Sequence, residues 1–152
     1  MELYLDGYLD WELRAPWEFQ RALQKGRMES FFGRITGHPN HLKAFDRVKT
    51  ELNLVTRMFK GRDEIPLKQI VGSVDKYELF TRSLMPVSAR LKDRWITIYN
   101  LAEGPRGFPP IDVYRVGEGY FILDGHHRAS VSRFLGNQLI EANVIEWIVL
   151  PT

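Results

Sequence analysis

The chain has 152 residues, of which 44% are hydrophobic and 26% charged, a composition that suits one globular core and excludes a disordered or fibrous protein. Its 21 Lys and Arg residues against 19 Asp and Glu residues leave a net charge of only +2, so a chain-wide nucleic-acid-binding surface is not indicated. Cysteine is absent, which excludes disulfides, thiolate nucleophiles and cysteine-based zinc sites.

The two ends of the sequence carry no sign of export or membrane insertion. Glu2, Asp6 and Asp10 stand where a secretory signal would have basic residues. The longest apolar tract, residues 144–150, is interrupted by Glu146 and is far shorter than the ~20 residues that a membrane-spanning helix needs. We therefore expect a soluble, cytoplasmic protein without a membrane partner.

The N-terminal part of the sequence predicts helices. Apolar residues recur at roughly helical spacing from 16 to 35, with Pro16 suited to the first helical position, while Gly26 and Gly33 weaken the pattern and mark points where it would split. A second helix is predicted over residues 40–52, with Asn40 as its cap. The polar stretch 60–63 breaks this periodicity. Residues 1–62 are therefore predicted to form an α-helical N-terminal appendage, and residues 63–152 the main domain.

The main domain mixes strands and helices without a regular repeat. The run 65–70 predicts an edge strand, because Pro66 cannot donate a ladder hydrogen bond, and a loop is predicted at Gly72-Ser73. A helix is predicted over 91–102, with Ser88 as its cap and Gly104 as its end. A hairpin of strands 111–116 and 120–123, a short helix over 125–136 and a last strand over 140–145 follow. This order predicts an α+β fold with a small mixed β-sheet and packed helices.

The segment Asp124-Gly125-His126-His127-Arg128 carries the clearest chemical signal. It connects the strand 120–123 to the short helix, so it aims the unpaired N–H groups and the positive end of the helix dipole at one point, which suits an anion. Gly125 lets the main chain approach a ligand, and Arg128 offers donors that match phosphate oxygens. His126 and His127 add donors or a proton shuttle, and Asp124 can cap the helix or hold a cation. A plain helix start explains each residue singly but not their clustering, so the segment predicts a phosphate site.

These residues, with Pro109-Pro110-Ile111-Asp112-Val113 before them and Leu135-Gly136 after them, resemble the ParB N-terminal/sulfiredoxin superfamily over about residues 64–147. The resemblance implies that superfamily's fold and a nucleotide whose phosphates rest on Gly125, His126, His127 and Arg128. Sulfiredoxins place a catalytic cysteine in this motif. Position 126 is histidine here, so the chain is not expected to be a sulfiredoxin. ParB partition proteins, which bind and hydrolyse CTP, have arginine-rich versions of the motif.

The free-serine kinase branch of the superfamily has an Asp-Gly-His-His-Arg motif similar to this one. In that branch an acidic residue shortly after the opening strand serves phosphoryl transfer, and Asp75 or Glu78 lies in the corresponding region. The resemblance therefore makes His127, Asp75 and Glu78 the candidate catalytic residues. The helical N-terminal part is most similar to uncharacterised stand-alone ParB-like proteins of prokaryotes.

The cofactors implied are ATP, ADP or CTP with Mg²⁺, and the candidate oxygen ligands of that metal are Asp124, Glu146 and Asp75. Two functions stay open, beside a third hypothesis of a scaffold whose phosphate site is vestigial and which the helical N-terminal part holds in an assembly. One is a nucleotide-dependent phosphotransferase or nucleotide hydrolase. The alternative is a non-catalytic, regulatory or DNA-associated binding module, which the locally basic segments 43–62 and 82–94 favour.

Overall fold

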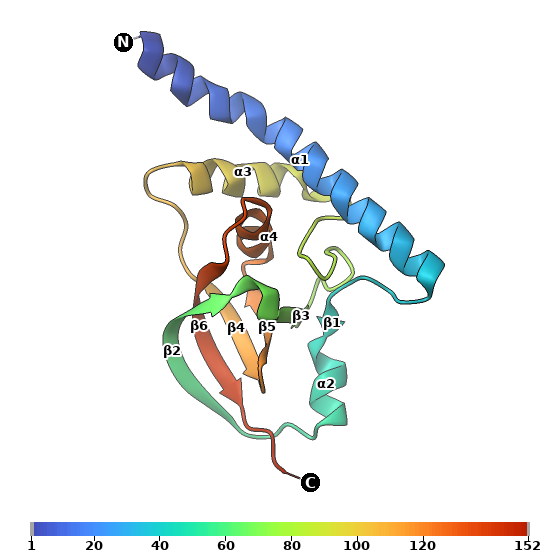
Figure 1. Cartoon of the computed structure of the whole chain (residues 1–152). Coiled ribbons are helices and arrows are strands. Elements are labelled where there is room, and N and C mark those ends of the chain that lie inside the picture. Colours follow the sequence, from blue (N-terminus) through green and yellow to red (C-terminus); the bar gives the residue numbers. More distant parts are fainter. Residues whose placement is uncertain (1, 152) are drawn as a thin grey trace.

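The computed structural model describes residues 2–151, with side chains from residue 13 onward (Figure 1). Its helices are α1 (Glu2–Thr36), α2 (Phe45–Glu51), α3 (Lys92–Glu103) and α4 (His126–Phe134). Its strands are β1 (Lys43–Ala44), β2 (Arg57–Pro66), β3 (Ile70–Ser73), β4 (Ile111–Val116), β5 (Gly119–Asp124) and β6 (Leu139–Trp147). Two short 3₁₀ turns, Leu67–Gln69 and Ala89–Leu91, complete the described elements.

The strands form one six-stranded mixed sheet in the order β1-β3-β5-β4-β6-β2. The β4–β5 and β2–β6 pairs are antiparallel, whereas β1–β3, β3–β5 and β4–β6 are parallel. A central β5 flanked by one parallel and one antiparallel neighbour is typical of a mixed sheet rather than of a repeated βαβ unit. The predicted α+β class with a small mixed sheet is confirmed.

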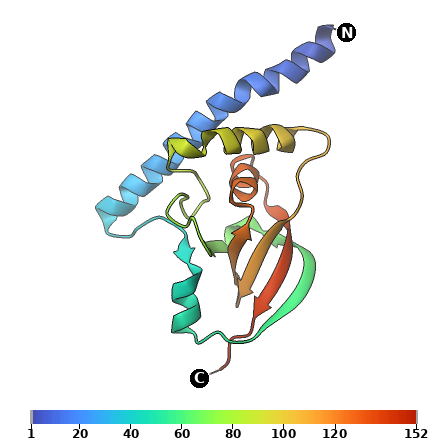
Figure 2. The same ribbon diagram turned by 180° about the vertical axis from the view of Figure 1, so that it is seen from behind.

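The two faces of the sheet bury different cores, because successive side chains of a strand point to opposite faces. Val113 and Ile122 belong to the main core under the helices, while their chain neighbours Tyr114 and Phe121 pack with Phe45 of α2 in a second cluster. Above the main face, α4 lies next to the sheet with α3 beyond it, and α1 crosses both helices obliquely (Figures 1 and 2). The site region at the start of α4 therefore lies between the sheet and a stack of helices.

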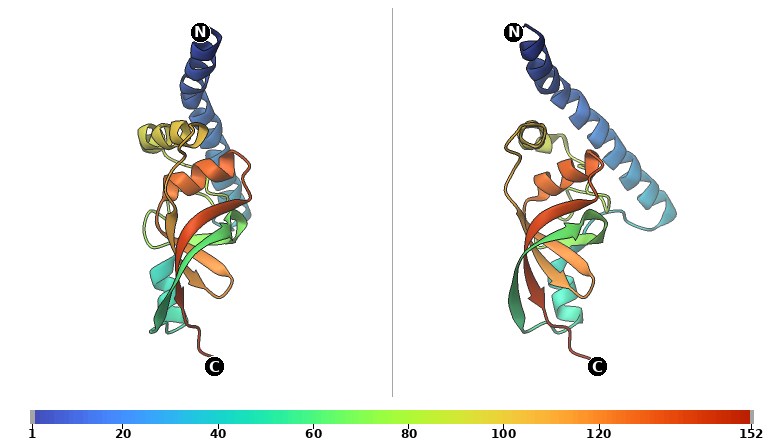
Figure 3. Two further views of the ribbon diagram at one scale, coloured as in Figure 1. Left: turned by 90° about the vertical axis from the view of Figure 1, so that its left-hand side faces the viewer. Right: turned by 60° about the vertical axis from the view of Figure 1, so that its left-hand side comes forward.

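Helix α1 is longer and more continuous than predicted. It begins well before Pro16, which lies inside the helix, so the predicted start at Pro16 was wrong. Gly26 does not split it either. A Cβ at Gly26 would lie 2.1 Å from the carbonyl oxygen of Pro86, so the glycine permits a close approach of helix and loop. The first half of α1 projects beyond the rest of the molecule (Figure 3). None of the described helices combines the length and apolar character needed to cross a membrane.

The segment between α1 and the main sheet also differs from the prediction. The helix predicted over 40–52 covers only Phe45–Glu51, and the Asn40 side chain accepts a hydrogen bond from the main-chain N–H of Arg82 instead of capping it. Residues 60–63, predicted to interrupt the helical periodicity and to mark the boundary between the two parts, lie inside β2. This strand is at the edge of the sheet, where exposed polar side chains are tolerated. The predicted division between residues 62 and 63 thus falls within a strand.

The second half of the chain follows the prediction closely. The Ser88 side chain accepts a hydrogen bond from the N–H of Arg90 just before α3, and Gly104 ends that helix. The β4–β5 hairpin, α4 and β6 lie where they were expected. The edge strand predicted over 65–70 was wrong: Pro66 is the last residue of the edge strand β2, residues 67–69 form a 3₁₀ turn, and Ile70 begins the inner strand β3. The loop predicted at Gly72 and Ser73 was wrong as well, since both residues lie in β3.

Candidate functional site

The site is built on the direct transition from β5 to α4. Gly125 takes the N-cap position of α4 with φ 110° and ψ 28°, a left-handed conformation that favours glycine. A Cβ at this position would also lie 2.4 Å from Cγ2 of Ile111. Glycine has no side chain to cap the helix, and no described side chain does so in its place. The first-turn N–H groups of α4, which intrahelical bonds cannot satisfy, therefore lack a side-chain acceptor.

The Arg128 side chain forms hydrogen bonds within the protein, so most of its guanidinium is not available to a ligand. Its Nη1 donates to the carbonyl oxygens of Pro109 at 3.1 Å and Pro110 at 2.8 Å, and its Nη2 donates to Oδ2 of Asp124 at 3.1 Å. These bonds fasten the loop before β4 to the first turn of α4. They also occupy Asp124, predicted as a cap, with an ion pair to Arg128 instead. A ligand would meet one end of this guanidinium and not its full fork of donors.

His126 is buried and is held through Ser73 at the end of β3. Its Nε2 contacts the Ser73 hydroxyl, which also bonds to the carbonyl oxygen of Asp75 and accepts from the Asp75 N–H. Since the hydroxyl donates its one hydrogen to that carbonyl, Nε2 of His126 is assigned as the donor to Ser73. The carboxylate Oδ1 of Asp75 lies 3.6 Å from the same Nε2. Asp75, predicted from the sequence, is therefore beside the motif.

His127 is also buried, and it differs from His126 in the environment of its Nε2. Its Nε2 has none among the described residues, and its ring meets Phe80 edge-on, with 5.6 Å between centroids. The same Phe80 ring stacks on His126 at 5.9 Å. The pKa of both histidines is lowered to about 4, chiefly by burial, and for His127 the positive charges of Arg94 and Lys76 contribute to this shift. Both rings are therefore neutral at pH 7 and are weak bases there.

The depressed histidine pKa values make stability pH-dependent. A histidine titrates near 6.5 in the unfolded chain and at about 4 here, so between these values the unfolded state binds more protons. Their contribution is complete above pH 6.5 and is lost as the pH falls toward 4. We expect urea unfolding to show a loss of roughly 2 kcal/mol per histidine between pH 7 and pH 5.

The variant His127→Phe removes one of these groups together with its unpaired nitrogen. We expect this variant to lose about half as much stability as the unaltered protein over the same pH interval. An equal loss in the two proteins would show that His127 is not held neutral by burial.

Two predicted acidic residues do not join the motif. Glu78 lines a separate cavity next to α1. Glu146 forms an ion pair with Lys60 at 3.3 Å and lies level with Arg115 and Tyr120 in the sheet register. Tyr120 is four residues, roughly 13 Å, from Asp124 along β5. A magnesium site shared by Asp124 and Glu146 is therefore excluded by the register of the sheet. Within the described residues no three His, Cys, Asp or Glu side chains are grouped to hold a metal.

Two residues at the centre of the site were missed. Ser73 holds His126, and Phe80 contacts both histidine rings. The sequence offered one signal for Ser73, its position two residues before Asp75. It offered none for Phe80, because the loop that carries this residue meets α4 only in the folded chain.

The protein is thus a mixed α+β protein in which the central strand β5 leads directly into α4, a helix whose N-terminus has no side-chain cap among the described residues. The chain matches no family model and none of the curated proteins. Among solved structures it is similar to the sulfiredoxin of Arabidopsis thaliana, with a TM-score of 0.39 and 19% sequence identity. The similarity covers 55% of this chain and 82% of that one, and it concerns the fold alone.

Proposed function

We propose that the protein is a nucleotide-binding member of the ParB/sulfiredoxin-like group, with the ligand's phosphates at the N-terminus of α4. One observation carries the proposal: α4 begins at a left-handed glycine that no described side chain caps. Its first-turn N–H groups and the positive end of its dipole therefore lack an anionic partner. Loops of this kind are ready-made anion sites because the glycine lets the main chain come close to the ligand.

The charges around this helix start suit a phosphate that arrives with a divalent cation. Asp75 and Asp124 have side chains that are 64% and 69% exposed. Both carboxylates are close enough to His126 to raise its pKa, against the larger lowering effect of burial. Mg²⁺ is bound by one or two protein carboxylates together with phosphate oxygens and waters, so a three-residue cluster is not required. Mg²⁺ would supply neutralisation of phosphate charge, while Lys76 adds a positive side chain next to both histidines.

If the protein transfers a phosphoryl group, the structure favours a different proton acceptor from the one expected. The Nε2 of His127 is buried, so a substrate hydroxyl cannot approach it. Asp75 is exposed and lies beside the motif, so it is the better candidate. His126 and Ser73 would then position Asp75 through its main chain.

Titration calorimetry with ATP, ADP and CTP in the presence of Mg²⁺ tests the proposal. We expect at least one of these nucleotides to bind, and Lys76→Gln to weaken that binding roughly fivefold, or about 1 kcal/mol. Lys60→Gln removes the same charge from β2, where Lys60 pairs with Glu146, and is expected to leave the affinity unchanged. Absence of heat with all three nucleotides would reject the proposal. Arg128→Ala is a poorer probe, because it releases Pro109 and Pro110 as well.

A further inference from the structure

A cavity of about 580 Å³ lies between the C-terminal half of α1 and the loop that precedes α3. Its volume falls within the range of small-molecule sites, roughly 300–1,000 Å³. One wall is formed by α1, and the other by the segment after α1 together with the loop that carries Glu78 and Phe80. Phe80 also contacts His126 and His127, so its ring separates this cavity from the start of α4. The cavity is thus a second place where a ligand can be held.

The α1 wall presents two arginines to this cavity. Arg27 and Arg34 are seven residues, or about two helical turns, apart and therefore lie on the same side of α1, with Ser30 between them. Neither guanidinium has a hydrogen-bond or ion-pair partner within residues 13–151. Glu78 is the one carboxylate among the residues that line the cavity, so the lining carries a net positive charge. Guanidinium groups in such a position match phosphate and carboxylate oxygens.

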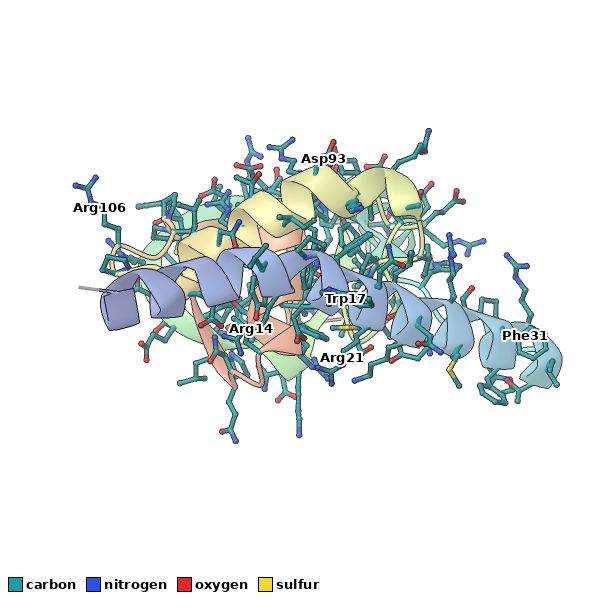
Figure 4. All side chains as sticks on the ribbon, turned by 90° about the horizontal axis from the view of Figure 1, so that it is seen from above. Arg14, Trp17, Arg21, Phe31, Asp93 and Arg106 are labelled. Carbon is teal, nitrogen blue, oxygen red and sulfur yellow. The ribbon has the colours of Figure 1, made fainter. Side chains whose placement is uncertain are left out.

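The opposite wall offers one further donor and one acceptor whose orientations are fixed. The side-chain Oδ1 of Asn40 accepts from the main-chain N–H of Arg82 at 3.0 Å, which leaves the side-chain NH₂ of Asn40 free to donate. Nδ1 of His41 donates to the carbonyl oxygen of Leu42 at 2.8 Å, which in a neutral imidazole leaves Nε2 as an acceptor for a donor group of a ligand. Two aromatic rings, Phe31 and Phe80, complete the lining. Figure 4 shows Phe31 near the C-terminal end of α1.

We infer that this cavity binds a small phosphomonoester with a flat ring. Arg27 and Arg34 bind the phosphate, the exposed Phe31 packs against the ring, and Glu78 accepts a hydrogen bond from a donor group on the ligand's body. The inference does not rest on nucleotide binding at α4, since none of its lining residues belongs to the Asp124–Arg128 segment.

Amide chemical-shift mapping of the full chain separates the two sites, with phenyl phosphate as the probe and inorganic phosphate and phenol as its two halves. We expect phenyl phosphate to shift the amides of residues 27–41 and 78–87, and to bind more tightly than either half. Shifts confined to residues 124–129, or no saturable shift at millimolar concentrations, would overturn the inference. Either result leaves nucleotide binding at α4 to its own calorimetric test.

Matched variants test the assigned contacts. The pair Arg27→Gln/Arg34→Gln is expected to weaken phenyl phosphate binding at least about tenfold. The control pair Lys25→Gln/Arg106→Gln removes the same two charges outside the cavity, and Arg106 lies at the opposite end of the molecule from Phe31 in Figure 4. We expect it to leave the affinity within about twofold. Phe31→Ala should weaken phenyl phosphate but not inorganic phosphate. Equal losses in the two charge pairs would show a general charge effect and contradict the site.

Discussion

Replacing Phe19 with alanine is expected to destabilise the protein by about 3–5 kcal/mol, measured as the free energy of unfolding in urea. Phe19 is fully buried, and its ring lies 5.6 Å from that of Trp95 on α3. Trp95 in turn stacks on Tyr99 and donates a hydrogen bond to the Ser130 hydroxyl of α4 at 3.0 Å. Deletion of the Phe19 ring therefore leaves a cavity where α1, α3 and α4 meet.

Trp17→Ala is the matched control, because Trp17 lies two residues away on the same helix with 75% of its surface exposed. We expect this control to change stability by no more than about 0.5 kcal/mol. If Phe19→Ala costs as little as Trp17→Ala, α1 does not share the core of the sheet and acts as the independent appendage predicted from the sequence.

Gly125→Ala is expected to destabilise the protein by roughly 2–5 kcal/mol and to abolish nucleotide binding. Two effects add. Alanine is strained at φ 110°, and its Cβ would overlap Cγ2 and Cβ of Ile111 at 2.4 and 2.8 Å. Relief of this overlap must move the start of α4 away from β4, and with it the N–H groups proposed to bind phosphate. Thermal unfolding and calorimetry with the Mg²⁺-bound nucleotide measure the two consequences.

Gly136→Ala separates conformational strain from steric overlap. Gly136 has φ 86° at the other end of α4, but nothing lies within 4 Å of the position that its Cβ would take. We expect this control to cost about 1 kcal/mol and to bind nucleotide like the unaltered protein. Equal effects of the two substitutions on binding would mean that the site does not depend on the geometry of Gly125.

The parts of the fold that could be predicted from the sequence are those with local signals. Ser88 and Gly104 mark the ends of α3, two glycines mark the β4–β5 hairpin, and Gly125 and Gly136 frame α4. The parts that could not be predicted depend on contacts between distant segments. From the sequence, Gly26 is expected to weaken a helix. Its reason is a long-range contact, because a Cβ at this position would overlap the carbonyl oxygen of Pro86. The edge strand β2 is polar and gains its structure from pairing with β6, about eighty residues later in the chain.

The site divides in the same way. Asp124 to Arg128 lie together because they are consecutive in the sequence, and Asp75, suggested by the resemblance to the free-serine kinases, lies beside His126. The sequence could not assign Arg128 to the carbonyls of Pro109 and Pro110, because a motif does not tell whether an arginine serves the ligand or the fold. It could not assign burial to the two histidines, because the ring that covers them, Phe80, comes from a distant loop. Residue types in a motif therefore indicate the chemistry available, and long-range packing decides which of them use it.

Amide chemical-shift mapping with Mg²⁺-bound ATP, ADP and CTP tests the proposed phosphate site at α4 most directly. For a nucleotide that binds, the account predicts saturable shifts of the Gly125, His126, His127 and Arg128 amides, with Gly136 at the far end of the helix little affected. Saturable shifts elsewhere in the chain without any change in the amide resonances of residues 125–128, or no shifts with any of the three nucleotides, would contradict the account.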